Sequence, residues 1–400
     1  MHNPVAVSSI PRQRARYQVI FAGVCALILT VGLARFAYTP MLPIMRSQVG
    51  LSYLAGGWLA TINYAGYMAG ALLAASISDL GRKFVLFRIG LVFAVLSTAA
   101  MGMTENVYLW ALLRFVSGVS STAGLLLASG LVLNWLIRHG CRAELGLHFT
   151  GVGLGIVVSG VAIAGMESLA WDQQWIGLGA LGILFFLPAW YWLPAPSALQ
   201  AGASKTPTMA VVAPSPHWMG LLIVAYFCAG FGYVVSATFI VAILENLPLL
   251  AGKGSWVWVT VGIAATPASF FWDRTARVIG QIPALLLAYG LQTVSIILSV
   301  LTDSSTLNLI SAILFGGTFV GIVSLTLTLI GRCYPENPAK AMARLTLSYG
   351  VAQILAPAMG GYIAAASGSY ERALIVAAGV MIAGMLLLVA LRNHDGRQEA

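Results

Sequence analysis

Charged residues are scarce in this sequence. Asp, Glu, Lys and Arg make up 8% of its 400 residues, against about 25% in an ordinary soluble domain, and 59% of the residues are hydrophobic. The few charges are clustered between long apolar stretches instead of being spread along them. This composition indicates a membrane protein and leaves no soluble domain of useful size.

The sequence also lacks residues at the spacing of a disulfide, a metal site or a catalytic site. Cys25, Cys141, Cys228 and Cys333 have neither CxxC spacing nor neighbouring histidines, so we expect neither a disulfide nor a metal site. The sequence contains no phosphate-binding loop and no Ser, His and Asp in an order that could form a hydrolytic triad. We therefore predict no catalytic residues, no cofactor and no enzymatic activity.

Twelve segments are long and apolar enough to cross a bilayer, which takes about 20 residues in a helix. They cover residues 17–45, 53–77, 84–103, 107–137, 145–166, 174–193, 218–246, 256–272, 281–301, 306–331, 340–366 and 371–391. A Pro-, Ala- and Ser-rich segment separates the first six from the last six. The sequence thus predicts an N-terminal six-helix bundle over 1–193, a linker over 194–217 and a C-terminal six-helix bundle over 218–400.

Basic residues divide unequally between the two sides of the membrane that this segmentation creates. The side of the N-terminus carries sixteen, which are Arg12, Arg14, Arg16, Arg82, Lys83, Arg88, Arg138, Arg142, Lys205, Arg274, Arg277, Arg332, Lys340, Arg344, Arg392 and Arg397. The opposite side carries Arg46, Lys253 and Arg372. Because positive loops stay in the cytoplasm, both termini and the linker are predicted to be cytoplasmic. The net charge of +9 therefore reflects topology, and we expect no nucleic-acid partner.

The two halves contain related stretches at corresponding places. The second helix is followed by SDLGRKF (78–84) in the first half and by WDRTARV (272–278) in the second half. The fifth helix contains TGVGLGIVVSG (150–160) in the first half and SYGVAQILAPAMGG (348–361) in the second half. Parallel six-helix repeats around a central substrate site are the architecture of a large class of transporters.

Over essentially its full length, the chain resembles the major facilitator superfamily. The resemblance rests on SDLGRKF, on LLRFVSG (112–118), similar to the fourth-helix motif, and on GVGLGIVVSG (151–160), similar to the fifth-helix motif of antiporters but without its proline. More narrowly, GLARFAYTPMLPIM (32–45) and WLATINYAGYMAGALL (58–73) resemble the YbfB/YjiJ-like branch. The resemblance implies an all-α membrane protein with twelve transmembrane helices in two pseudo-symmetric bundles. It also implies alternating access in a bacterial inner membrane and gives no substrate.

Two arginines lie at depths where hydrocarbon is expected. Arg35 precedes Arg46 by 11 residues, which places it about 16 Å from that end of the helix, and Arg114 lies well inside the fourth helix. No Asp or Glu lies at a comparable depth, so an anionic substrate would compensate the charge. Two alternatives stay open. Pro40 and Pro43 would end the first helix early and let Arg35 reach water, and Arg114 would bond backbone or polar groups, as it often does in the resembled family.

Polar side chains at helical spacing complete the predicted substrate site. They are Tyr38 on the first helix, Asn63, Tyr64 and Tyr67 on the second, Tyr226 and Tyr233 on the seventh, and Tyr349 and Gln353 on the eleventh. Spacings of three, four and seven place the members of each set on one helix face. They would line a cavity and orient a small ligand. The alternative is that they hydrogen-bond between packed helices.

Other residues are predicted to serve conformational change. Asp79, Gly81, Arg82 and Lys83, with Asp273 and Arg277 in the second half, would form latches that hold one conformation. Gly118, Gly151 and Gly155 would let helices pack closely and slide. Pro40 and Pro43 are expected to bend or unwind the end of the first helix. His148 is expected near the headgroups at a helix end.

These observations predict a secondary transporter or facilitator for a small organic molecule, preferably an anion, with or without protons. We expect it to act as a monomer whose other partner is the lipid bilayer. The missing deep carboxylate argues against a standard carboxylate-based proton symporter. Two alternatives remain, namely an efflux pump for apolar or cationic drugs, supported by the aromatic content, and a non-transporting membrane sensor.

Overall fold

The computed structural model describes residues 9–141, 145–196, 214–245, 250, 252–302, 304–334 and 338–395, and every regular element in those ranges is a helix. The first half contains α1 (Ser9–Leu27), η1 (Ile28–Phe36), α2 (Tyr38–Val49), α3 (Tyr53–Ser76), α4 (Leu80–Ala100), η2 (Met101–Met103), α5 (Val107–Thr122), η3 (Ala123–Ala128), α6 (Ser129–Arg138), α7 (Gly146–Gly165) and α8 (Trp171–Trp192). The second half contains α9 (Pro216–Leu244), α10 (Gly254–Ala265), α11 (Ala268–Ile279), α12 (Gln281–Leu301), α13 (Ser305–Cys333), α14 (Pro338–Ser367) and α15 (Glu371–Asp395).

The predicted membrane segments agree with these helices to within a few residues at most ends. Within the described ranges, nine helices are long and apolar enough to cross a membrane, and the first of them runs from Gln13 to Val49 through α1, η1 and α2. The remaining predicted segments correspond to α3, to α14, and to α10 with α11. The segment predicted over 256–272 is divided because Pro267, between α10 and α11, has no N–H to continue the helix. Most of the predicted linker, residues 197–213, lies outside the described residues.

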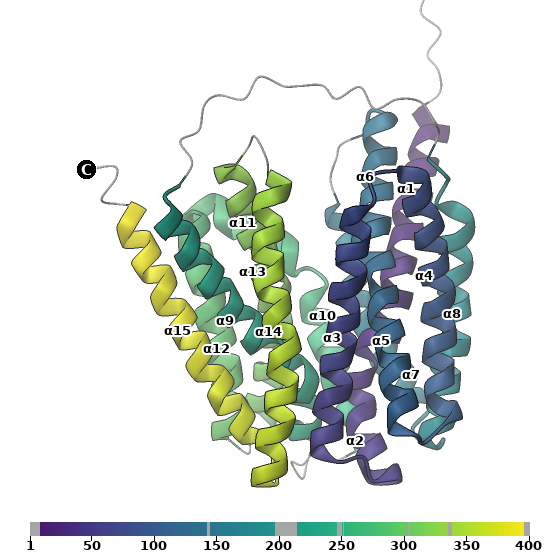
Figure 1. The fold of residues 1–400 in the computed structure, drawn as a ribbon, viewed down its shortest axis with the longest axis vertical. Coiled ribbons are helices and arrows are strands. Elements are labelled where there is room, and N and C mark those ends of the chain that lie inside the picture. The colour runs from purple at the N-terminus through teal and green to yellow at the C-terminus, as the bar shows by residue number, and fades with distance from the viewer. Residues whose placement is uncertain are drawn as a thin grey trace, which may run out of the picture.

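The helices form two groups that lie side by side. Figure 1 shows α1–α8 in one group and α9–α15 in the other, with the start of α1 and the end of α15 at the same end of the molecule. We call this end the terminal side and the opposite end, where α2 lies, the far side. The two groups contact each other mainly through α3 with α14, α7 with α10, and α2 with α9.

On the far side the two groups are held together by hydrogen bonds and ring contacts. Tyr53 donates a hydrogen bond to the Gly368 carbonyl oxygen at 2.7 Å. The guanidinium carbon of Arg46 lies 3.3 Å from the centre of the Tyr53 ring and 5.5 Å from that of Tyr370. Burial raises the pKa of Tyr370 to about 12, so its hydroxyl stays neutral beside Arg46. These contacts close the far side between the groups.

The backbones of the two groups approach each other closely on this side. A Cβ atom added to Gly57 of α3 would lie 2.8 Å from the Gly361 Cα atom of α14. Side chains at both positions would hold the helices apart, so two glycines are needed for this contact. Nearer the membrane centre, Thr61 donates a hydrogen bond to the Ile354 carbonyl oxygen at 2.9 Å. The α3–α14 contact therefore continues from the far side into the middle of the molecule.

Candidate functional site

A cavity of about 260 Å³ lies between the two groups of helices. It is lined by Val31, Arg35, Phe36, Tyr67, Leu125, Leu126, Phe149, Val152, Tyr226, Tyr233, Phe319, Val320, Val323, Leu327, Thr346, Tyr349 and Gln353. Phe149 lies in the first turn of α7, whose start is on the terminal side. The cavity therefore runs from the level of Arg35 toward the terminal side, while the far side is closed.

Arg35 supplies the positive charge of this cavity, and no carboxylate is among the lining residues described above. The side chain is 4% exposed and its guanidinium carbon lies 4.4 Å from the centre of the Tyr64 ring and 4.6 Å from that of Tyr67. Its buried Nε atom has no hydrogen-bond partner in the described part of the chain. Cation–π contacts thus hold the guanidinium by its face while its N–H donors stay available to a ligand.

The backbone that carries Arg35 is a π-helix, η1, which ends four residues before Pro40. Ala37 donates its N–H to the Gly32 carbonyl oxygen at 2.9 Å, five residues back instead of four. Because Pro40 has no N–H, one carbonyl group near the end of η1 loses its backbone donor. The helix does not unwind, since α2 continues through Pro43 to Val49. The alternative in which the prolines end the helix and expose Arg35 to water is therefore wrong.

Arg114 donates hydrogen bonds to carbonyl groups at this end of η1. Its Nη1 atom lies 3.2 Å from the Ala34 carbonyl oxygen and 3.4 Å from that of Arg35, and its Nε atom lies 3.5 Å from the Leu59 carbonyl oxygen. The side chain is 2% exposed and does not line the cavity. Arg114 thus positions the backbone at Arg35, in keeping with the alternative in which it bonds backbone groups.

Replacing Arg114 with Lys is expected to lower the free energy of unfolding by about 2–4 kcal/mol, because buried carbonyl oxygens of two helices would lose their donors. A fall in the melting temperature of the purified protein would show this loss. The matched control is Arg332→Lys, an exposed arginine at the end of α13, which should change the melting temperature little. An unchanged melting temperature for Arg114→Lys would contradict the positioning role.

Aromatic rings from the second group form the opposite wall of the cavity. The ring centres of Tyr226 and Tyr349 are 4.6 Å apart, those of Tyr233 and Tyr349 are 5.8 Å apart, and those of Tyr233 and Phe319 are 5.2 Å apart. The last two pairs are stacked, with interplanar angles of 23°. Gln353, one turn beyond Tyr349 on α14, adds an amide group to this wall. The wall is therefore aromatic with a few polar groups.

Six of the ten predicted substrate residues line the cavity, and four, Arg114 among them, lie elsewhere. Tyr38 donates to the Gly56 carbonyl oxygen at 2.9 Å, and Asn63 donates to the Arg114 carbonyl oxygen at 2.9 Å. Tyr64 lies against Arg35 and supports it. Helical spacing predicted the shared faces but could not show which face turns toward the cavity.

The lining residues that the sequence analysis missed are mostly apolar, and Phe149, Phe319 and Thr346 are examples. Thr346 lies three residues before Tyr349 on the same face of α14, so helical spacing could have found it. Phe319 carries no polar group that would separate it from ordinary core residues. Apolar lining residues of this kind are visible only once the helices are assembled.

The predicted latch residues have local roles in this conformation. The Asp79 carboxylate caps α4 by accepting the Arg82 N–H at 2.7 Å, and Gly81 lies beside it. Asp273 and Arg277 form an exposed ion pair within α11. In the described ranges, neither Arg82 nor Lys83 pairs with a carboxylate. Their role as latches stays a prediction for another conformation.

The predicted packing glycines lie at close helix contacts. A Cβ atom on Gly155 of α7 would be 2.9 Å from the Gly32 Cα atom in η1, and one on Gly151 would be 2.9 Å from the Leu27 Cβ atom. Gly118 of α5 packs against the Asn63 carbonyl group of α3. These contacts account for packing, and sliding of the helices stays a prediction.

The expectation for His148 is wrong in part. Its side chain is fully buried because α1 and α6 cover the start of α7. The imidazole packs against Gly23, and its Nε2 atom lies 2.8 Å from the Ser129 Oγ atom. It therefore lies near a helix start, as expected, but is buried between helices instead of lying among headgroups.

Known proteins share both the sequence pattern and the fold of this chain. A family model described as "Uncharacterised MFS-type transporter YbfB" matches residues 27–389. The chain is 28% identical to a gallate transporter of Pseudomonas putida over 204 residues, which is 50% of this chain and 45% of that protein. It is 32% identical to the MFS-type transporter YceJ of Bacillus subtilis (strain 168) over 97 residues, or 24% of this chain and 25% of that protein. The chain thus spans less than half the length of either relative.

Solved structures show the same fold at low sequence identity. A mutant of the nucleoside transporter NupG has a TM-score of 0.76 at 12% identity, over 94% of this chain and 99% of that chain. A bacterial homolog of the human lysosomal transporter Spinster, in an inward-facing and occupied conformation, has a TM-score of 0.63 at 15% identity, over 96% of both chains. The predicted all-α membrane fold is confirmed by these likenesses.

Proposed function

Because the chain belongs to the YbfB family of MFS-type transporters, we propose that it carries a small organic carboxylate across the bacterial inner membrane by alternating access. The observation that carries the proposal is the buried, unpaired guanidinium of Arg35 in a cavity whose described lining contains no carboxylate. Membership of this family of transporters also confirms the prediction that the chain is not an enzyme.

An anion is the ligand that this charge pattern favours. A cation held in apolar surroundings costs several kcal/mol unless an anion or strong acceptors meet it. The face of Arg35 is occupied by Tyr64 and Tyr67, so a ligand would meet the edge of the guanidinium, which carries the N–H donors. A carboxylate matches two parallel donors of that edge. A cationic ligand would instead be repelled.

The aromatic wall favours a flat substrate body. Tyr226, Tyr233 and Tyr349 line the cavity from the second group, and offset stacking of an aromatic ligand against such rings would contribute about 0.5–1.5 kcal/mol per ring pair beyond area burial. Gallate, the substrate named for the relative from Pseudomonas putida, is an aromatic carboxylate and fits this arrangement. We therefore expect planar carboxylates to bind more tightly than aliphatic ones.

The remaining features of the transport cycle follow from the same proposal. Both termini and the linker lie in the cytoplasm, so the terminal side of the cavity faces the cytoplasm. The helices of residues 1–193 and of 218–400 rock as two bundles, joined by the segment 194–217. The protein works as a monomer, and protons enter with the substrate, if at all. In the opposite conformation, latches are formed by Arg82 and Lys83 in the first half and by Arg277 in the second half.

A ligand screen on the purified protein tests the proposal. The panel contains aromatic carboxylates, aliphatic carboxylates, phosphonates, sulfonates and cationic drugs, with the melting temperature as the readout. Carboxylates should raise the melting temperature, aromatic ones most, and the best of them should then enter proteoliposomes that contain the protein. Stabilisation by cationic drugs alone would contradict the proposal and favour the efflux alternative, which the aromatic wall also suits.

A further inference from the structure

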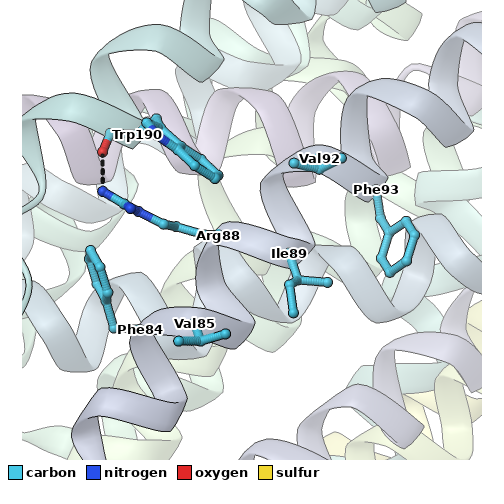
Figure 2. A pocket seen from close by; sticks show the side chains of 7 residues that line it. All are labelled: Phe84, Val85, Arg88, Ile89, Val92, Phe93 and Trp190. Carbon is cyan, nitrogen blue, oxygen red and sulfur yellow. Dashed lines mark hydrogen bonds between the residues drawn. The ribbon is translucent and has the colours of Figure 1, made fainter.

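A second cavity lies on the outer surface of the first group of helices, between α4 and α8. It has a volume of about 340 Å³ and shares no residue with the central cavity. Figure 2 shows its lining, which consists of Arg88 and six apolar side chains. Val85, Ile89 and Phe93 are exposed although they lie on a membrane-spanning helix, so this surface faces lipid. We call this cavity the α4–α8 groove.

The α4–α8 groove runs from the terminal side toward the membrane centre. Its lining on α4 begins at Phe84, four residues after the first residue of the helix, and ends at Phe93, about 14 Å further along the axis. Its remaining member, Trp190, lies two residues before the end of α8. Tryptophan is typical of the level where hydrocarbon meets headgroups. The groove thus has the direction and depth of the part of a lipid acyl chain that lies nearest to the headgroup.

Arg88 places a positive charge at the headgroup end of the groove. Its guanidinium carbon lies 4.6 Å from the centre of the Phe84 ring and 4.5 Å from that of Trp190. Its Nη2 atom donates to the Trp190 carbonyl oxygen at 3.3 Å (Figure 2). Its Nε atom is buried without a partner, and no carboxylate pairs with it in the described residues. The charge of Arg88 is therefore oriented by two rings but not neutralised.

We propose that the α4–α8 groove binds one anionic phospholipid, with an acyl chain along Val85, Ile89 and Val92 and the phosphate against Arg88. Guanidinium groups bind phosphate through charge-assisted hydrogen bonds. Arg82 and Lys83 lie one to two turns nearer the terminal side and add positive charge there. Among the described residues, the Asp79 carboxylate just before α4 is engaged in capping that helix. A net negative headgroup complements this surface better than a zwitterionic one, whose ammonium group would meet three cations.

Native mass spectrometry of the purified full chain, equilibrated with phosphatidylglycerol or with phosphatidylcholine, tests the proposal. We expect one phosphatidylglycerol to remain bound after the weaker lipids have dissociated. Arg88→Gln should lower its apparent affinity about fivefold or more. Arg274→Gln, which removes an exposed arginine of α11, is the matched control and should leave the affinity unchanged.

A second variant tests the acyl-chain part of the site and does not depend on Arg88. Ile89→Trp fills the groove at an exposed position, so the protein should fold, and phosphatidylglycerol retention should fall by a similar factor. Equal loss in Arg88→Gln and Arg274→Gln would overturn the proposal, because binding would then follow net charge alone. Retention of phosphatidylglycerol by both Arg88→Gln and Ile89→Trp, or equal retention of phosphatidylcholine by the unaltered protein, would also overturn it.

Discussion

Replacing Arg35 with Gln is expected to lower the affinity for the transported carboxylate about a hundredfold. The substitution removes the positive charge of the cavity and the fork of donors that a carboxylate would engage. Nothing in the described lining could take over this task, since no Lys or second Arg lies in it. Isothermal titration of the best carboxylate from the ligand screen measures the change, and uptake into proteoliposomes should fall in parallel.

The same substitution should leave the folded protein intact. The Arg35 side chain makes no hydrogen bond to another described residue, and its burial without an anion is itself unfavourable. The melting temperature of unliganded Arg35→Gln should therefore equal or exceed that of the unaltered protein. This outcome separates Arg35 from Arg114, whose replacement should reduce stability because it bonds carbonyl groups of η1 and α3.

Arg35→Lys tests the role of the guanidinium group with a smaller change than Arg35→Gln. It keeps the charge but loses the planar fork, so the affinity should fall by roughly tenfold, between the unaltered protein and Arg35→Gln. Arg332→Gln removes an exposed arginine outside the cavity and should leave the affinity unchanged. Unchanged carboxylate binding by Arg35→Gln would refute the proposed site, because the ligand would then have to bind elsewhere.

The helices of this protein could be predicted from the sequence because long apolar segments have few alternatives in a bilayer. The depth of Arg35 and the lack of a carboxylate at its level were also readable, since both depend only on position along a helix. The role of Arg114 was predicted only as one of two alternatives, contact with substrate or bonds to backbone groups. Its hydrogen bonds to the Ala34 and Arg35 carbonyl oxygens of η1 become visible only with the neighbouring helix in place.

The lining of the cavity was predictable in part, for a geometric reason. Spacing shows which residues share a helix face, but the rotation of that helix is set by its neighbours. On α3, Asn63 turns toward α5 and Tyr67 toward the cavity, although both were grouped as polar candidates. His148 was misplaced for a similar reason, because its position near a helix start gave no sign that α1 covers it.

Replacing Gly57 with Leu is expected to open the far side between the two groups and to reduce transport to less than about a tenth. The three atoms nearest to a Cβ atom at Gly57 all belong to α14, to Pro357 and Gly361. We therefore expect the substitution to act first on the contact between the groups. A carrier that cannot close one side cannot complete an alternating cycle.

Labelling of a cysteine at position 61 reports on this opening. Thr61 is buried in the α3–α14 contact, and Thr61→Cys is made in a chain whose four native cysteines have been replaced. Adding Gly57→Leu should raise the rate of labelling by a membrane-impermeant maleimide from the far side by about tenfold or more. Gly379→Leu on α15 is the matched control, since a Cβ atom there meets nothing within 4 Å. If Gly57→Leu left both labelling and transport unchanged, the α3–α14 contact would not govern access from the far side.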